Sequence, residues 1–169
     1  MDYSKNKWAT TYIGLGSNQN QPLKQLQQAC QALNTLPHSR FIAVSPYYQN
    51  QALGTQPQTD YINAVACLET TLSPEHLLNQ LQTIEHQQGR RRNNHTHWAP
   101  RPLDLDILLM GSLQIQTARL TIPHSQIAFR SFVLKPLYTL NPHLEIPQLG
   151  PISTLLLHCP DHTLEEIIT

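Results

Sequence analysis

The sequence predicts an α+β fold: a ferredoxin-like βαββαβ sandwich with additional C-terminal strands and helices. Two observations predict it. Runs rich in β-forming residues and runs with helical apolar spacing follow one another in the order strand, helix, strand, strand, helix, strand. The chain also contains no linker and no low-complexity tract, so we expect residues 1–169 to form a single domain, in which residues 1–9 are a polar N-terminal extension.

The first half of this pattern consists of a strand, a helix and two further strands. Residues 10–16 are rich in β-formers and end in glycines, which predicts a strand that runs into a tight turn. Pro22 then opens a helix whose apolar side chains have the spacing of one buried face. Residues 40–48 and 61–70 are predicted to be the second and third strands, with a loop between them.

The third predicted strand carries two polar side chains on one face. Every second residue from Ile62 to Leu68 is apolar and is expected to face a core. Tyr61 and Asn63 are therefore expected to lie together on the opposite face.

The second half begins with a clearly marked helix. Ser73-Pro74-Glu75 supplies an N-cap hydroxyl, a proline in the first turn and an acid near the positive end of the helix dipole, and Gly89 suits a C-terminal cap. Residues 90–101 are polar and basic without periodicity, so we expect a loop or lid there. The elements expected after this loop are a strand at 103–110, two short strands around 113–122, a helix over roughly 130–140 and a short helix at 152–158.

The composition is that of a neutral protein. The chain has 11 Lys and Arg against 11 Asp and Glu, whereas a general nucleic-acid binder needs an excess of positive charge. No apolar run approaches the roughly 20 residues that span a bilayer, and the polar segment Met1–Lys7 lacks the apolar core of a secretion signal. The three cysteines form no C-x-x-C pair, which fits a reducing compartment. We therefore expect a cytoplasmic protein that binds small molecules, with neither nucleic acid nor membrane as a partner. We also expect a monomer, although the composition leaves the oligomeric state open.

The neutral total conceals a local excess of arginine. Six of the seven arginines fall between positions 90 and 130. If the fold brings them together, they form one positive site suited to a small polyanion such as a nucleotide. Otherwise they are solvated surface side chains, and the spacing alone leaves both interpretations open.

Asp104 and Asp106 stand inside an apolar strand. A period of two puts both carboxylates on one face, with Cα atoms ~6.6 Å apart. The residues expected to face the core are Leu103, Leu105, Ile107 and Leu109. Two carboxylates this close repel each other unless a cation lies between them, and a pair of divalent ions with phosphate ligands would suit the spacing. A solvent-facing polar edge of the strand is the simpler alternative.

The residues before this pair favour the metal interpretation. Arg101 lies three residues ahead of Asp104, Trp98 precedes it, and the run Arg90–Arg92 comes one short loop earlier. Acids for metal, arginines for phosphate oxygens and an aromatic ring for a planar group are the parts that phosphoryl transfer from ATP requires. The sequence contains no P-loop, Rossmann or protein-kinase signature.

Two other classes of protein would use some of the same parts. A ferredoxin-like RNA-binding or ligand-sensing module would use the sheet aromatics and Arg90–Arg92, but two acids on the same face would repel RNA. A D-x-D glycosyltransferase would use metal and nucleotide, but it normally needs a domain larger than 169 residues.

Six sequence blocks complete the picture. They are Tyr12-Ile13-Gly14-Leu15-Gly16-Ser17-Asn18, Asp60-Tyr61-Ile62-Asn63-Ala64, Ile84-Glu85 through Gln88-Gly89-Arg90, Trp98-Ala99-Pro100-Arg101-Pro102-Leu103-Asp104-Leu105-Asp106-Ile107, Leu120-Thr121-Ile122-Pro123-His124 and Arg130-Ser131-Phe132-Val133-Leu134. In this order, over about residues 10–158, they resemble the bacterial 6-hydroxymethyl-7,8-dihydropterin pyrophosphokinase family of the folate pathway.

The resemblance implies ATP-dependent pyrophosphoryl transfer to the hydroxymethyl group of the dihydropterin, with AMP as the second product. It implies that Asp104 and Asp106 hold two Mg²⁺ ions and that Arg90 and Arg101 stabilise the transferring group, which makes these four residues the catalytic set. The implied ATP-binding residues are Gln82, Glu85, Arg92, Ile107, Arg119, Leu120, Thr121, His124 and Arg130. The implied pterin-binding residues are Leu53, Tyr61, Asn63, Trp98 and Phe132.

Overall fold

The computed structural model describes residues 7–55, 57–91 and 101–169. Within these ranges six strands form one sheet in the order β10-β3-β4-β1-β5, with β2 also paired to β4. Each pairing in this sheet is antiparallel. The strands are β1 (Ala9–Ser17), β2 (Ser39–Val44), β3 (Tyr47–Asn50), β4 (Tyr61–Thr70), β5 (Asp104–Met110) and β10 (Glu165–Ile167).

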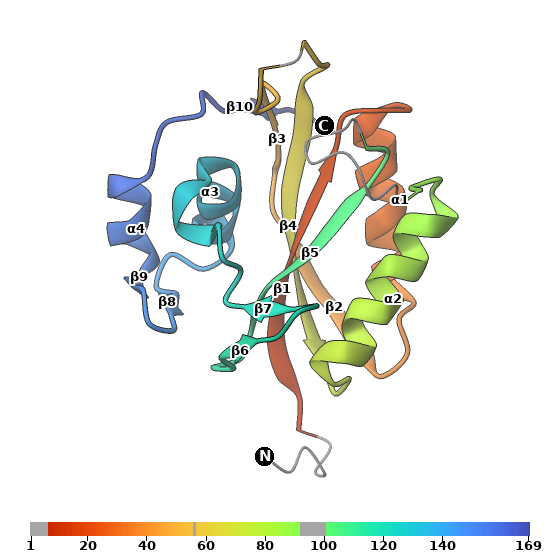
Figure 1. Ribbon diagram of the computed structural model, residues 1–169, viewed down its shortest axis with the longest axis vertical. Helices are drawn as coiled ribbons and strands as arrows, with labels where there is room; N and C mark the ends of the chain where they lie inside the picture. Colours follow the sequence, from red (N-terminus) through yellow and green to blue (C-terminus); the bar gives the residue numbers. More distant parts are fainter. Residues whose placement is uncertain (1–6, 56, 92–100) are drawn as a thin grey trace.

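Helices cover both faces of the sheet (Figure 1). α1 (Pro22–Asn34) and α2 (Pro74–Gln87) lie on one face, and α3 (Ser131–Leu140) and α4 (Ile152–His158) lie on the other. The smaller elements are β6 (Ile115–Gln116), β7 (Thr121–Ile122), a 3-10 turn (Ile127–Phe129), β8 (Glu145–Ile146) and β9 (Gly150–Pro151). In the described residues, no helix has the length and apolar character that a membrane crossing requires.

The alternation of side chains along β4 feeds two apolar cores. Ala64 and Ala66 belong to the core under α1 and α2, as the sequence predicted. Val65 and Cys67 belong to a second core under α3 and α4. Because both faces of β4 are covered, its polar side chains lie near its two ends, with Tyr61 and Asn63 at one end and Glu69 and Thr70 at the other.

The prediction of one continuous strand over 40–48 was wrong, because the segment divides into β2 and β3. Both pieces pair with β4, and Ser45-Pro46 separates them. The backbone N–H of Val65 donates to the Ser45 hydroxyl at 2.9 Å, so a side chain takes the place of a ladder carbonyl. Pro46 has no N–H to offer a neighbouring strand. β3, the piece after the break, also pairs with β10.

The expectation that Leu109 faces the same core as Leu105 and Ile107 was also wrong. The pairing of β1 with β5 shifts register, since Tyr12 lies opposite Leu109 and Ile13 opposite Ile107. Leu108 is therefore an extra residue, and such a bulge turns two successive side chains to one side. Leu108 and Leu109 both pack in the core under α3.

The predicted limits of α2 are confirmed. The Ser73 hydroxyl accepts the N–H of His76 at 3.3 Å. Gly89 follows the helix with φ +94°, a conformation that glycine adopts without strain. Because the chain turns there, Arg90 leaves α2 beside the start of β5, where it donates to the carbonyl of Leu103 at 3.4 Å.

Candidate active site

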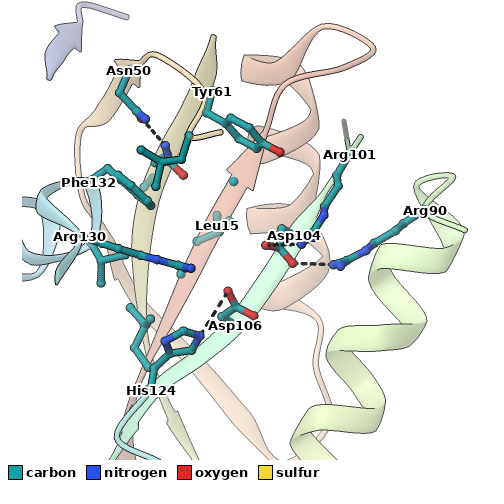
Figure 2. Close-up of a pocket in the computed structure, with 17 residues that line it drawn as sticks. Leu15, Asn50, Tyr61, Arg90, Arg101, Asp104, Asp106, His124, Arg130 and Phe132 are labelled. Carbon is teal, nitrogen blue, oxygen red and sulfur yellow. Dashed lines mark hydrogen bonds and ion pairs between the residues drawn. The ribbon is translucent and has the colours of Figure 1, made fainter. Parts of the chain in front are cut away.

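One cavity of about 330 Å³ collects most of the residues that the sequence singled out (Figure 2). It opens at the ends of β1, β4 and β5 and is closed on one side by the start of α3. The predicted site residues that line it are Leu53, Tyr61, Asn63, Arg90, Arg101, Asp104, Asp106, His124, Arg130 and Phe132. Segments far apart in the sequence thus meet at one site.

Asp104 is gripped by two arginines. Its Oδ1 accepts from Arg90 and its Oδ2 from Arg101, the second bond being 3.2 Å long. The Arg90 side chain is 13% exposed, so this charge is held largely inside the protein. Hydrogen bonds between ionised groups are stronger than neutral ones, and together they fix both guanidinium groups at the wall of the cavity.

Glu85 lies behind Arg90 rather than at the cavity. Its carboxylate is 2.8 Å from Nη1 of Arg90, and it accepts the backbone N–H of Leu105 at 2.9 Å. The residue is 1% exposed. Glu85 therefore connects α2 to β5 and holds the Arg90 side chain in place.

Asp106 faces the cavity one pleat away from Asp104 (Figure 2). Burial, then the negative charges of Asp104 and Glu85, raise the pKa of its carboxyl well above the ordinary value, against smaller opposing effects of Arg130 and Arg90. Its side chain is still 39% exposed, so water in the cavity reaches it. A positive charge bound next to Asp106 would therefore be stabilised by the neighbouring carboxylates.

His124 lies next to Asp106, with 3.9 Å between its Nε2 and the carboxylate. Burial and then the charge of Arg130 lower the pKa of the imidazole. The neutral ring cannot form an ion pair with Asp106, and at this distance the contact is not a hydrogen bond. His124 therefore adds no positive charge next to Asp106.

The donor set fits a hard divalent cation. Mg²⁺ is usually held by one or two carboxylates and completes its shell with waters and substrate phosphates. Asp104 and Asp106 supply two such carboxylates on one face of β5, directed into the cavity. Among the described residues no group of three or more His, Cys, Asp and Glu side chains could form a self-sufficient metal cage. Two carboxylates leave most of the coordination shell of Mg²⁺ to waters and ligand oxygens.

An aromatic and amide subsite lies beyond this charged end. Tyr61 from β4 and Phe132 from α3 both line the cavity, and so does Asn63, two residues after Tyr61 on β4. The Asn63 side-chain amide donates to Oδ1 of Asn50, which is 4% exposed. A Cβ atom built on Gly16 would lie 2.9 Å from Oδ1 of Asn63, so a larger residue at position 16 would force the Asn63 amide to shift. This end suits a flat ring with polar edges.

Several predicted ligand residues lie elsewhere. Ile107 is 3% exposed and packs in the core, and Leu120 is 8% exposed in the same core. Arg119 lies at the surface of α2, where it bonds Glu75 at 2.7 Å and Asn79 at 2.9 Å. Gln82 and Thr121 are half-buried and do not line the cavity. The predicted roles of Arg92 and Trp98 fall outside the described residues.

Asn18 is a site residue that pattern reasoning missed. It is 2% exposed, and its Oδ1 accepts the backbone N–H of Arg101 at 2.8 Å. Its Nδ2 donates to the carbonyl of Thr59 at 3.3 Å. It connects the segment that carries Arg101 to the segment that leads into Tyr61. In the sequence it stands at the end of the first of the six blocks, directly after the first strand, and no role was predicted for it.

The cavity is lined by two carboxylates, three arginines and a pair of aromatic rings. Enzymes that bind a polyphosphate together with a divalent cation use side chains of these kinds. The fold and the site thus define a polyphosphate-binding enzyme that works with a divalent cation.

Known proteins identify the family. The family model described as 7,8-dihydro-6-hydroxymethylpterin-pyrophosphokinase matches residues 12–142. The 2-amino-4-hydroxy-6-hydroxymethyldihydropteridine pyrophosphokinase of Haemophilus influenzae is 45% identical over 155 residues, which is 92% of this chain and 96% of the relative. The protein of the same name from Pseudomonas aeruginosa is 44% identical over 156 residues, covering 92% and 95%. The chain belongs to the 7,8-dihydro-6-hydroxymethylpterin-pyrophosphokinase family.

A solved structure agrees with the fold. Wild-type Plasmodium falciparum HPPK-DHPS with pteroate superimposes with a TM-score of 0.69 at 13% sequence identity. The match covers 91% of this chain and 43% of that one, so this chain spans less than half of the longer protein.

Proposed function

We propose that this chain transfers a pyrophosphoryl group from ATP to the hydroxymethyl group of 6-hydroxymethyl-7,8-dihydropterin, giving the pterin diphosphate and AMP in folate biosynthesis. Membership of the family supports the reaction. The observation that carries it is a single cavity in which Arg90 and Arg101 meet Asp104 while Tyr61 and Phe132 enter from other elements.

Asp104 and Asp106 are the proposed holders of two Mg²⁺ ions. Both carboxylates are directed into the cavity, and burial, together with the charges of Asp104 and Glu85, raises the pKa of Asp106. Bound there, Mg²⁺ would neutralise phosphate charge and draw electron density from the hydroxymethyl oxygen. The protein's own contribution is to hold the two acids on one rigid strand.

The two substrates are proposed to occupy different ends of the cavity. We assign the triphosphate to the end of Asp106, because His124 and Arg130 line it there. The full proposed ATP set is Gln82, Glu85, Arg92, Ile107, Arg119, Leu120, Thr121, His124 and Arg130, of which the buried residues would act through backbone or through their neighbours. The proposed pterin set is Leu53, Tyr61, Asn63, Trp98 and Phe132.

In the proposed reaction the hydroxymethyl oxygen attacks the β-phosphorus and AMP departs. The hydroxyl proton leaves to Asp106 or to solvent. The protein positions the substrates and stabilises charge, since phosphoryl transfer requires little covalent chemistry from the protein. The bond between Asn63 and Asn50 fixes the amide that orients the pterin edge.

Arg90 and Arg101 are proposed to stabilise the transferring group. A guanidinium carries five N–H donors, so each arginine keeps donors beyond those bound to Asp104. Its planar fork matches two oxygens of a phosphate. Because Glu85 and Asp104 already hold Arg90, little side-chain entropy remains to be lost when phosphate binds.

The remaining proposals concern the whole molecule. We propose that β1 to β5 with α1 and α2 form a ferredoxin-like sandwich, because β1 lies between β4 and β5 and a helix makes each crossover. We also propose one domain, acting as a cytoplasmic monomer on small molecules and not on nucleic acid.

The test is AMP release measured with ATP, Mg²⁺ and 6-hydroxymethyl-7,8-dihydropterin. AMP and pterin diphosphate should form in equal amounts, and omission of either Mg²⁺ or the pterin should stop the reaction. The variant Asp104→Asn serves as the inactive control. Release of ADP, or AMP release that ignores the pterin, would overturn the proposal, and nucleotide-sugar turnover would point to the glycosyltransferase alternative.

A further inference from the structure

The segment after α4 lies against the cavity end of α3, and His162 makes the contact. Its Nδ1 lies 2.8 Å from the hydroxyl of Ser131 and accepts the backbone N–H of Ser131 at 3.2 Å. The N–H of His162 in turn donates to the Ser131 hydroxyl at 3.2 Å. Ser131 is the first residue of α3, and the preceding Arg130 gives no side-chain cap. A residue 31 positions away therefore caps this helix.

The same imidazole packs on a ring of the cavity wall. The ring centroids of Phe132 and His162 are 5.4 Å apart and the rings are inclined by 73°. This edge-to-face arrangement is the favoured geometry of aromatic pairs. Phe132 also lines the cavity. One side chain thus holds both the backbone that carries Phe132 and the ring itself.

The segment is anchored on its other side as well. Directly after it, β10 pairs with β3, with Glu165 opposite Gln49. β3 ends at Asn50, which lines the cavity and bonds Asn63. Residues 161–165 therefore connect α3, which carries Phe132, to β3, which carries Asn50. Held at both ends, His162 has little freedom to move away from Phe132.

We propose that His162 is a positioning residue of the pterin site. By capping Ser131 and packing on Phe132, it sets the orientation in which the phenyl ring meets the flat substrate. The proposal rests on the proposed function, which assigns Phe132 to the pterin. His162 lies outside residues 12–142, which are the residues that the family model matches.

Calorimetric titration of His162→Ala tests this. We expect the Kd of 6-hydroxymethyl-7,8-dihydropterin to rise about 3- to 10-fold, as the loss of an aromatic pair predicts, with the Kd of ATP unchanged. His162→Phe keeps a ring and loses the acceptor, whereas His162→Asn keeps an acceptor and loses the ring. Each should recover part of the affinity. His158→Ala, at an exposed residue of α4 whose Nδ1 lies 2.9 Å from the carbonyl of Thr154, is the matched control and should bind both ligands normally.

The imidazole NMR signals of His162 give a readout that does not depend on activity. They should show Nδ1 as an unprotonated acceptor and should shift when the pterin is added. Should His162→Ala fail to fold, the phenylalanine and asparagine variants still compare the two contacts. An unchanged pterin Kd in all three variants, or equal losses of ATP and pterin affinity, would overturn the proposal. A wild-type protein that binds no pterin would overturn the proposed function instead, and this proposal with it.

Discussion

The carboxylate of Glu85 lies 2.8 Å from Nη1 of Arg90, and the same oxygen accepts the backbone N–H of Leu105 at 2.9 Å. A single side chain of α2 thus fixes both the arginine that leaves this helix and the strand that carries the two aspartates. The alignment of Arg90 with Asp104 is therefore a property of the α2–β5 contact rather than of the loop between them.

Replacing Glu85 with alanine should destabilise the fold. The change leaves Arg90 with one anion fewer and the N–H of Leu105 without this acceptor, and breaking a buried pair costs about 3 kcal/mol. Glu85→Gln should cost less, because its amide oxygen can still accept from Leu105. Urea unfolding measures both. The exposed pair of Glu75 and Arg119 supplies the control, since Glu75→Ala should cost less than about 1 kcal/mol. Equal losses in the Glu85 and Glu75 variants would contradict the role given to Glu85.

Asp106→Asn should abolish turnover and stabilise the metal-free protein at high pH. The folded protein raises the pKa of Asp106 to about 7. Between the ordinary aspartate pKa and this value, the folded state keeps a proton that the unfolded state has released. Stability conferred by this group therefore falls as the pH rises through that window and stays low above it.

Asparagine at position 106 removes this loss. Thermal unfolding in the presence of a chelator, at about pH 4 and about pH 8, should show a gain for the variant at the higher pH alone. A gain of equal size at both pH values, or near-normal AMP release at saturating Mg²⁺, would contradict the assignment.

Tyr61→Ala and Phe132→Ala should weaken pterin binding far more than ATP binding. Each removes one aromatic wall of the subsite, and stacking of a flat ring on an aromatic side chain contributes about 1–3 kcal/mol. Calorimetric titration with each ligand separately measures the difference. Tyr138→Ala removes an aromatic residue of α3 that is 39% exposed and lies away from the cavity, so it should bind both ligands normally.

Arg90→Ala and Arg101→Ala should lower kcat roughly 10³- to 10⁵-fold, as for other arginines that meet a transferring phosphoryl group. The Kd of ATP should change little, because the stabilisation develops with the charge of the transition state. Lysine should rescue poorly, since an ammonium lacks the planar fork. Single-turnover rates and ATP titration decide the matter, with exposed Arg40→Ala as the control. A change confined to the Kd would make both arginines binding residues only.

The sequence predicted what short-range periodicity encodes. Asp104 and Asp106 reached one face because a period of two acts over two residues, and Tyr61 and Asn63 did so for the same reason. The face of Leu109 was mispredicted because the bulge at Leu108 depends on how β5 pairs with β1. That pairing joins strands far apart in the sequence, so local periodicity does not predict it.

The supporting residues escaped prediction for a related reason. Asn18, Asn50 and His162 act through partners that lie 83, 13 and 31 positions away. Such partners are determined by how whole helices and strands pack, and no local sequence pattern predicts them. Likewise, Glu85 shares the periodicity of any helix residue, and only the structure shows that its carboxylate faces Arg90 instead of the cavity.

The tight fit of Gly16 under Asn63 has a consequence for inhibition. Any larger residue at position 16 would place a carbon 2.9 Å from the amide oxygen of Asn63 and displace it. We have proposed that this amide binds the pterin, and on that proposal a variant that evades an inhibitor by displacing the amide would also lose affinity for its substrate. A compound that draws its affinity from the Asn63 amide would therefore be hard to evade through a change at Gly16.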